Sequence, residues 1–201
     1  MDSDLIEKRR SQILAASMDA FAEKGYHDTK ISDIAERLGI GHGTFYRYFK
    51  NKLDIFFAVV DGFLAQIKVV VEEEAPQFSD SVESYRSQIR RIGGRMLRLF
   101  MADTRMARII FFQALGVDPA LDARLFSIKT LADSMVEAYL ANGIVKGFLR
   151  PDLDTAVLSR AINAMTLGAA FDILFAANPS ETGNRWIEAV SLLMLSGMAK
   201  P

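Results

Sequence analysis

"TKISDIAERLGIGHGTFYRYFKNKLDIF", residues 29–56, contains two short segments of helical pattern joined by a glycine-rich turn. In the first segment the apolar side chains fall on one face at helical spacing: Ile31, Ile34, Ala35 and Leu38. In the second, Phe45 and Phe49 stand four residues apart and share a face, and Ile40 lies in the turn. These faces predict two helices packed across the turn, a helix-turn-helix at about residues 30–49.

The second of these helices is predicted over residues 42–48, and its polar side chains lie opposite the two phenyl rings. If both rings point into a core, the following residues must point outward or stand at the exposed helix start: His42, Gly43, Thr44, Arg47 and Tyr48. A second helix that presents its N-terminal end is the geometry that enters the major groove of DNA. The pattern therefore predicts a DNA-reading helix.

The chemistry of this stretch suits DNA. Gly41 and Gly43 leave little side chain at the helix start, so backbone N–H groups can approach a phosphate closely. Thr44 can bond a phosphate or offer its methyl group to thymine, and Arg47 can bind guanine or a phosphate. Lys52, at the start of the next helix, is expected to neutralise a flanking phosphate.

Two alternatives remain open for the aromatic and histidine side chains. Tyr46 and Tyr48 carry hydroxyls for DNA contact, but half-buried packing would also explain them. His42 suits DNA contact at an exposed helix start. It is a poor metal candidate, because His27 is the other histidine and the chain has no cysteine. We predict no metal site.

Composition limits the partners. The 201 residues carry a net charge of −1, so attraction to nucleic acid has to come from a local patch. The stretch from Gly39 to Lys52 holds three basic residues and no acid. The most apolar runs, Ala161–Phe171 and Ala189–Ala199, are about half the ~18–20 residues that span a bilayer. We expect a cytoplasmic protein with no membrane partner, no cofactor and no enzymatic activity.

The helical pattern extends along the whole chain and predicts about nine helices, an all-α fold. Outside the turn, the helices are expected over these ranges: 6–24, 51–75, 82–101, 105–115, 119–142, 155–178 and 184–199. Asn51 and Asp118 are predicted helix caps, and Gly25 is predicted to stop the first helix. We divide the chain into a DNA-binding domain, 1–52, and a helical ligand-binding and dimerisation domain, 53–201.

The last two predicted helices, about 155–178 and 184–199, are apolar around most of their circumference. A helix of that kind is buried on more than one side. A self-complementary homodimer contact would cover the extra face, and an internal core is the alternative.

Two further sets of side chains suggest a ligand. Five arginines could cradle an anionic group or could form a solvated face paired with acids: Arg91, Arg95, Arg98, Arg105 and Arg108. Large apolar side chains could line an adaptable pocket, although most are expected in the core: Met96, Phe100, Phe111, Phe112, Met135, Tyr139, Met165 and Phe171.

The quoted stretch, preceded by "RRSQILAASMDAFAEKGY", resembles the N-terminal module of the TetR family of transcriptional regulators over about residues 7–60. The resemblance implies a dimeric helical domain that binds a small ligand, and it places these residues at positions that touch DNA: Thr29, Ser32, His42, Gly43, Thr44, Tyr46, Tyr48 and Lys52. Gly41 departs from the family pattern, where a serine cap is common, and Arg47 falls at a variable position.

Together these features predict a dimeric regulator, most simply a repressor, that binds double-stranded palindromic operator DNA. An apolar small-molecule effector is expected to release it. The alternative is a lipid or acyl-thioester binding protein whose helix-turn-helix-like module contacts protein.

Overall fold

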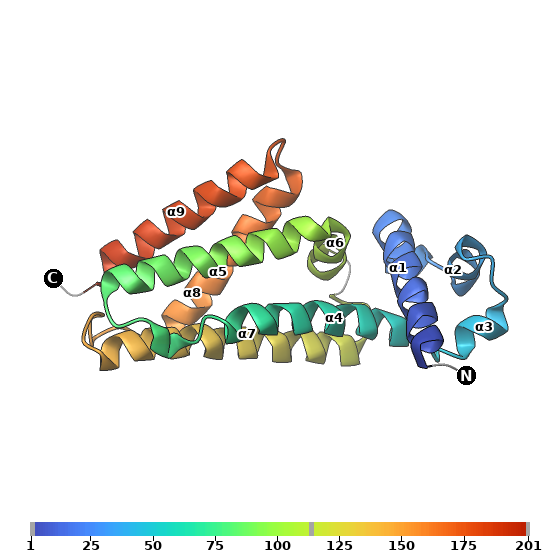
Figure 1. Ribbon diagram of the computed structural model, residues 1–201, viewed down its shortest axis with the longest axis horizontal. Coiled ribbons are helices and arrows are strands. Elements are labelled where there is room, and N and C mark those ends of the chain that lie inside the picture. The colour runs from blue at the N-terminus through green and yellow to red at the C-terminus, as the bar shows by residue number, and fades with distance from the viewer. Residues whose placement is uncertain (1–2, 113–114, 200–201) are drawn as a thin grey trace. The chain divides into compact units, whose positions relative to one another are not determined.

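The computed structural model describes residues 3–112 and 115–199, with side chains for all of these except residues 3, 106 and 110–112. The described residues form nine α-helices and one 3-10 helix, which confirms the all-α class (Figure 1). The helices are α1 (Ser3–Asp28), α2 (Ile31–Arg37), α3 (His42–Tyr46), α4 (Lys52–Glu72), η1 (Pro76–Phe78), α5 (Val82–Ala102), α6 (Thr104–Phe112), α7 (Pro119–Val145), α8 (Thr155–Phe175) and α9 (Pro179–Met198).

The helices gather into two compact units. Among the described residues, the first unit holds 3–65 and 103–124, and the second holds 66–102 and 125–199. Both α4 and α7 therefore contribute residues to each unit. This division by packing does not test the functional boundary predicted at residue 52, which stays a prediction.

Helix α6 belongs to the first unit because it packs on α1. Ala107 and Ile109 of α6 are fully buried. Arg105 donates hydrogen bonds to Asp103 at 2.8 and 2.6 Å and also pairs with Asp19 of α1. Helix α6, whose Arg105 lies 86 positions from Asp19, thus stabilises the unit that contains the helix-turn-helix.

Local capping signals set most helix starts. The Asn51 side chain accepts a hydrogen bond from the Asp54 amide at 2.8 Å, which confirms the predicted cap of α4. Asp118 likewise accepts from the Ala120 amide at 2.8 Å at the start of α7. Gly25 is non-helical, with φ of 81° and ψ of 165°, so the first helical segment ends where the stop was predicted. A short second segment continues α1 from there to Asp28.

Some predicted helix ends were wrong. Helix α9 begins at Pro179, not at residue 184, because Asn178 caps it by accepting a hydrogen bond from the Glu181 amide at 3.3 Å. Proline is tolerated in the first helical turn, so this Asn-Pro pair marks a helix start. Helix α8 accordingly ends at Phe175, three residues early, and α3 ends at Tyr46 instead of Tyr48.

The core of the second unit forms where α9 packs against α5 and α8; α5 and α9 run side by side (Figure 1). Its buried members are Tyr85, Tyr139, Leu140, Phe148, Leu149, Ile162, Met194, Leu195 and Met198. Glycines allow the close approach of α5 and α9. A Cβ added at Gly93 would lie 2.9 Å from Ile187, and one at Gly183 would lie 2.4 Å from Leu97.

Ser191 carries an energetic penalty in this core. Its Oγ is buried and has no hydrogen-bond partner among the described residues. We expect Ser191→Ala to raise the free energy of unfolding by about 1 kcal/mol, because it removes an unsatisfied hydroxyl and favours the helix. Urea denaturation measures the change.

The matched control is Ser159→Ala in α8. Ser159 is equally buried, but its Oγ donates a hydrogen bond to the Ala156 carbonyl at 3.1 Å. This variant is expected to gain nothing or to lose stability. If Ser191→Ala instead lowers the free energy of unfolding, as the loss of a satisfied hydroxyl would, the Ser191 hydroxyl has a hydrogen-bond partner.

Candidate DNA-binding interface

The turn between α2 and α3 is closed by backbone hydrogen bonds. The Ile40 amide donates to the Ala35 carbonyl at 3.0 Å, and the Gly39 amide donates to Glu36 at 3.1 Å. These two hydrogen bonds together form the Schellman motif, which requires a residue of positive φ after the helix. Gly39 meets that requirement with φ of 60°. Helix α2 therefore ends at a fixed angle to α3.

The predicted inward face of the helix-turn-helix is confirmed. Phe45 is 0% exposed and Phe49 is 2% exposed, and their ring centroids lie 6.0 Å apart. Ile34 and Ala35 of α2 are buried too. The Arg10 guanidinium lies 5.0 Å from the centre of the Phe49 ring and covers it from α1. These contacts fix the rotation of α3 about its own axis.

The opposite face of α3 is open to solvent. Tyr46 is 53% exposed, so core packing does not explain it. His42, Gly43 and Arg47 are exposed as well. Thr44 and Tyr48 are half-buried, as is Ser32 of α2. Side chains at these positions can therefore meet a ligand as large as a DNA duplex.

Thr29 lies inside the unit, unlike the other candidate DNA residues. It is 1% exposed, and its hydroxyl lies 2.7 Å from the Gly25 carbonyl oxygen and 3.1 Å from that of Ala20. Its amide donates to Gly25 at 3.3 Å. The side chain is used to hold the end of α1 and offers no surface to a partner in this conformation.

Lys52 makes contacts within the first unit that the sequence did not indicate. Its Nζ lies within hydrogen-bond distance of the carbonyl oxygens of Tyr26, His27 and Thr29, at 2.5, 3.1 and 2.9 Å. It also lies 4.3 Å from the centre of the Tyr26 ring. Twenty-six positions separate Lys52 from Tyr26, so no periodic pattern could have shown this contact.

The arginines of α5 pair with acids in the second unit. Arg91 makes two hydrogen bonds of 2.9 Å to the carboxylate of Glu74, which is nearly buried. Arg95 pairs with Glu73. This arrangement matches the solvated, acid-paired face and not an open anionic cradle. Arg98 and Arg108 are exposed.

Most of the predicted ligand residues lie in or near the core of the second unit. Tyr139 belongs to the buried cluster, and its hydroxyl donates to the Glu74 carbonyl at 2.6 Å. Met165 packs against the same cluster, and Phe100 is 8% exposed. The remaining predicted side chains with described positions are half-buried: Met96, Met135 and Phe171. The side chains of Phe111 and Phe112 lie outside the described residues.

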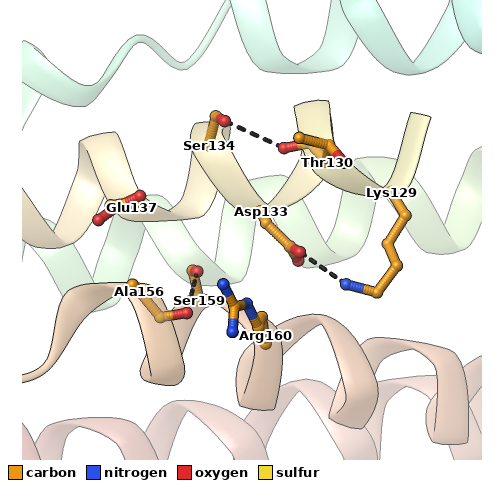
Figure 2. A pocket seen from close by; sticks show the side chains of 8 residues that line it. All are labelled: Lys129, Thr130, Asp133, Ser134, Glu137, Ala156, Ser159 and Arg160. Atoms are coloured by element: carbon orange, nitrogen blue, oxygen red, sulfur yellow. Dashed lines mark hydrogen bonds and ion pairs between the residues drawn. The ribbon is translucent and has the colours of Figure 1, made fainter. Parts of the chain in front are cut away.

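A pocket of about 510 Å³ lies between α7 and α8, and Figure 2 shows its lining. The lining is Lys129, Thr130, Asp133, Ser134, Glu137, Ala156, Ser159 and Arg160. Lys129 Nζ lies 2.7 Å from the Asp133 carboxylate, which holds the pKa of that carboxyl below its usual range. Charged and hydroxyl groups dominate this pocket, so an apolar effector does not fit it.

An all-helical chain that projects the polar face of a short helix beyond a tight turn defines a helix-turn-helix DNA-binding protein. The family model "Bacterial regulatory proteins, tetR family" matches residues 13–59. Residues 13–59 therefore match the N-terminal module of the TetR family of transcriptional regulators.

Relatives support the assignment over most of the chain. The fatty acid metabolism regulator protein of Bacillus subtilis is 26% identical over 151 residues, 75% of this chain and 76% of the relative. The transcriptional repressor KstR2 of Mycobacterium tuberculosis is 27% identical over 165 residues, 80% and 79% of the two chains. The crystal structure of the regulator FadR from Bacillus subtilis, in complex with stearoyl-CoA, has a TM-score of 0.74 at 21% identity and covers 90% of this chain and 97% of that one.

Proposed function

We propose that the chain represses transcription as a homodimer that binds a palindromic operator and leaves it when an apolar small molecule binds. The observation that carries the proposal is the rotation of α3: Phe45 and Phe49 are buried while Tyr46 is exposed. A helix held in this way can insert its start and polar face into a major groove. A dimer would place two such helices about 34–36 Å apart, in successive grooves.

The proposed DNA-contacting side chains are Ser32, His42, Thr44, Tyr46, Arg47 and Tyr48, with the Gly43 backbone. In this proposal Thr44, Arg47 and Tyr48 read bases or the adjoining phosphates, and Gly43 allows a close backbone approach. Thr29 supports the interface from the interior, since its hydroxyl is already bonded.

The homodimer is proposed to form through α8 and α9. Their outer sides expose large apolar side chains: Val157, Leu167, Phe175, Leu192 and Leu193. Helix α8 is long and apolar enough to cross a membrane by length and composition alone, and only 22% of its apolar window is buried within the chain. A second copy covering both helices would bury this surface in an isologous contact. In this proposal the protein works in the cytoplasm, with its operator.

Charge placed on this surface is expected to separate the dimer. Leu193 is 63% exposed on α9. In Leu193→Glu, dimerisation through α9 would bury an unpaired carboxylate at the interface. We expect at least a hundredfold weaker dimerisation, equivalent to about 3 kcal/mol or more. Sedimentation velocity across a concentration series measures it.

Val145→Glu is the matched control, because Val145 is 86% exposed at the end of α7. It should leave the dimer intact. If Leu193→Glu dimerises as strongly as the control, the α8–α9 interface is excluded.

The effector is proposed to carry a long apolar chain. A relative is named for fatty acid metabolism, and a solved relative of the same fold binds stearoyl-CoA. The predicted ligand side chains are buried or half-buried in this structure, so entry of a ligand would require them to move apart. Methionine suits that requirement because its side chain adapts to irregular shapes. Helix α4, which contributes to both units, is the proposed lever.

Fluorescence anisotropy with the promoter fragment beside the gene tests the proposal. Specific binding that stearoyl-CoA releases and free coenzyme A does not is the expected result. Retention of acyl ligand without selective binding to any genomic fragment would instead favour a lipid-binding protein whose helix-turn-helix contacts protein.

A further inference from the structure

The ammonium group of Lys52 closes the C-terminal end of α1. A helix leaves its last carbonyl oxygens without partners in the helix. Here the kink at Gly25 directs the carbonyls of the following turn toward the first residue of α4. Lys52 Nζ meets three of them, those of Tyr26, His27 and Thr29. An ammonium group has three hydrogens, so these acceptors match its full donor capacity.

The surroundings hold the Lys52 side chain in place. Its Nζ stands 4.3 Å from the centre of the Tyr26 ring, a cation–π distance. Tyr26 in turn packs on Phe56 of α4, with ring centroids 4.9 Å apart. Partial burial lowers the pKa of Lys52, and Asp28 opposes that shift. A cation near a helix C-terminus is also favoured by the helix dipole.

The same joint lies immediately before the helix-turn-helix. Lys52 binds the carbonyl of Thr29, and the Thr29 hydroxyl lies 2.7 Å from the Gly25 carbonyl oxygen, to which it donates, and 3.1 Å from that of Ala20. Helix α2 begins two residues after Thr29, at Ile31. The end of α1, the start of α2 and the first turn of α4 therefore meet at one ammonium group.

We propose that Lys52 is a positioning residue whose three carbonyl bonds fix the helix-turn-helix to the start of α4, and that operator affinity depends on this fixed geometry. The inference rests on the proposed function and refines it. A phosphate contact by Lys52 would require the ammonium group to give up carbonyl bonds, so its contribution to DNA binding is geometric. A displaced first turn of α4 would reach the DNA-reading helix through the same bonds.

The test compares Lys52→Met with Lys50→Met. Methionine keeps the length and the helix preference of lysine but removes the charge and the donors. Lys50 is exposed two residues away and serves as the matched control. Both variants are measured by amide hydrogen exchange without DNA and by operator anisotropy across a salt series, at a temperature where circular dichroism shows them folded.

For Lys52→Met we expect faster exchange of the amides of residues 26–37 and an operator affinity at least about tenfold weaker. The slope of log affinity against log salt should equal that of the wild type, because the number of neutralised phosphates is unchanged. Lys50→Met should leave the exchange at wild-type rates.

Three results overturn the inference. A slope reduced by about 0.9 in Lys52→Met would show a direct phosphate contact. Faster exchange with unchanged operator affinity would leave Lys52 a merely structural role. Unchanged exchange would show that the carbonyl bonds hold nothing in place. If the wild type itself binds no operator, the proposed function fails, and the exchange comparison still decides whether Lys52 fixes the joint.

Discussion

Replacing Phe45 with alanine is expected to lower the free energy of unfolding of the DNA-binding unit by about 3–5 kcal/mol. Phe45 is fully buried, and its ring centroid lies 6.0 Å from that of Phe49 and 5.6 Å from that of Tyr46. Its loss would leave a cavity beneath a helix of five residues, which has little stability of its own. Operator binding should disappear with the helix.

Circular dichroism during urea denaturation measures this change. Trp186, the single tryptophan, lies on α9 in the other unit, so its fluorescence reports on that unit independently. We expect helix content to fall at lower urea in Phe45→Ala than in the wild type. Phe78→Ala, at a site 61% exposed in η1, is the control and should change stability by less than about 0.5 kcal/mol. A loss below about 1 kcal/mol in Phe45→Ala would contradict the packing described for α3.

The helices and the inward face of the helix-turn-helix were predictable because their causes are local. Phe45 and Phe49 share a face because of their spacing alone. Asn51 caps α4 by accepting a hydrogen bond from the amide of Asp54, three positions later. Gly39 marks a turn because few other residues adopt positive φ without strain. Each signal acts within about one helical turn, which a single sequence can show.

The contacts of Thr29 and Lys52 were not predictable in the same way. Thr29 follows the kink at Gly25, and Lys52 of α4 meets carbonyl oxygens beyond that kink. The kink follows from one glycine conformation. The Arg105–Asp19 pair is equally invisible, since its partners are eighty-six positions apart. Spacing predicts which residues share a helix face; it does not predict which distant carbonyl or carboxylate that face meets.

The second large effect is expected from truncating two side chains on the outward face of α3. Thr44→Ala combined with Tyr48→Ala removes two hydroxyls and a ring but no charge and no buried apolar core. Each good base contact contributes about 1–3 kcal/mol of discrimination, so the pair should cost about 2–6 kcal/mol of operator affinity. That corresponds to a loss of roughly thirtyfold to more than ten-thousandfold.

Binding to unrelated DNA should survive this double substitution, because nonspecific affinity arises from phosphates and positive charge. The discrimination between operator and unrelated DNA should therefore fall, while stability stays close to that of the wild type. Thr130→Ala with Phe126→Ala, a matched pair of exposed sites on α7, should leave operator binding unchanged.

The anisotropy titration of the Thr44→Ala, Tyr48→Ala protein tests the central claim most directly, with operator and scrambled duplexes measured at several salt concentrations. Our account predicts that the operator and scrambled affinities converge while the dependence on salt stays steep. An operator affinity equal to that of the wild type, with discrimination intact, would contradict it and show that the outward face of α3 does not read DNA.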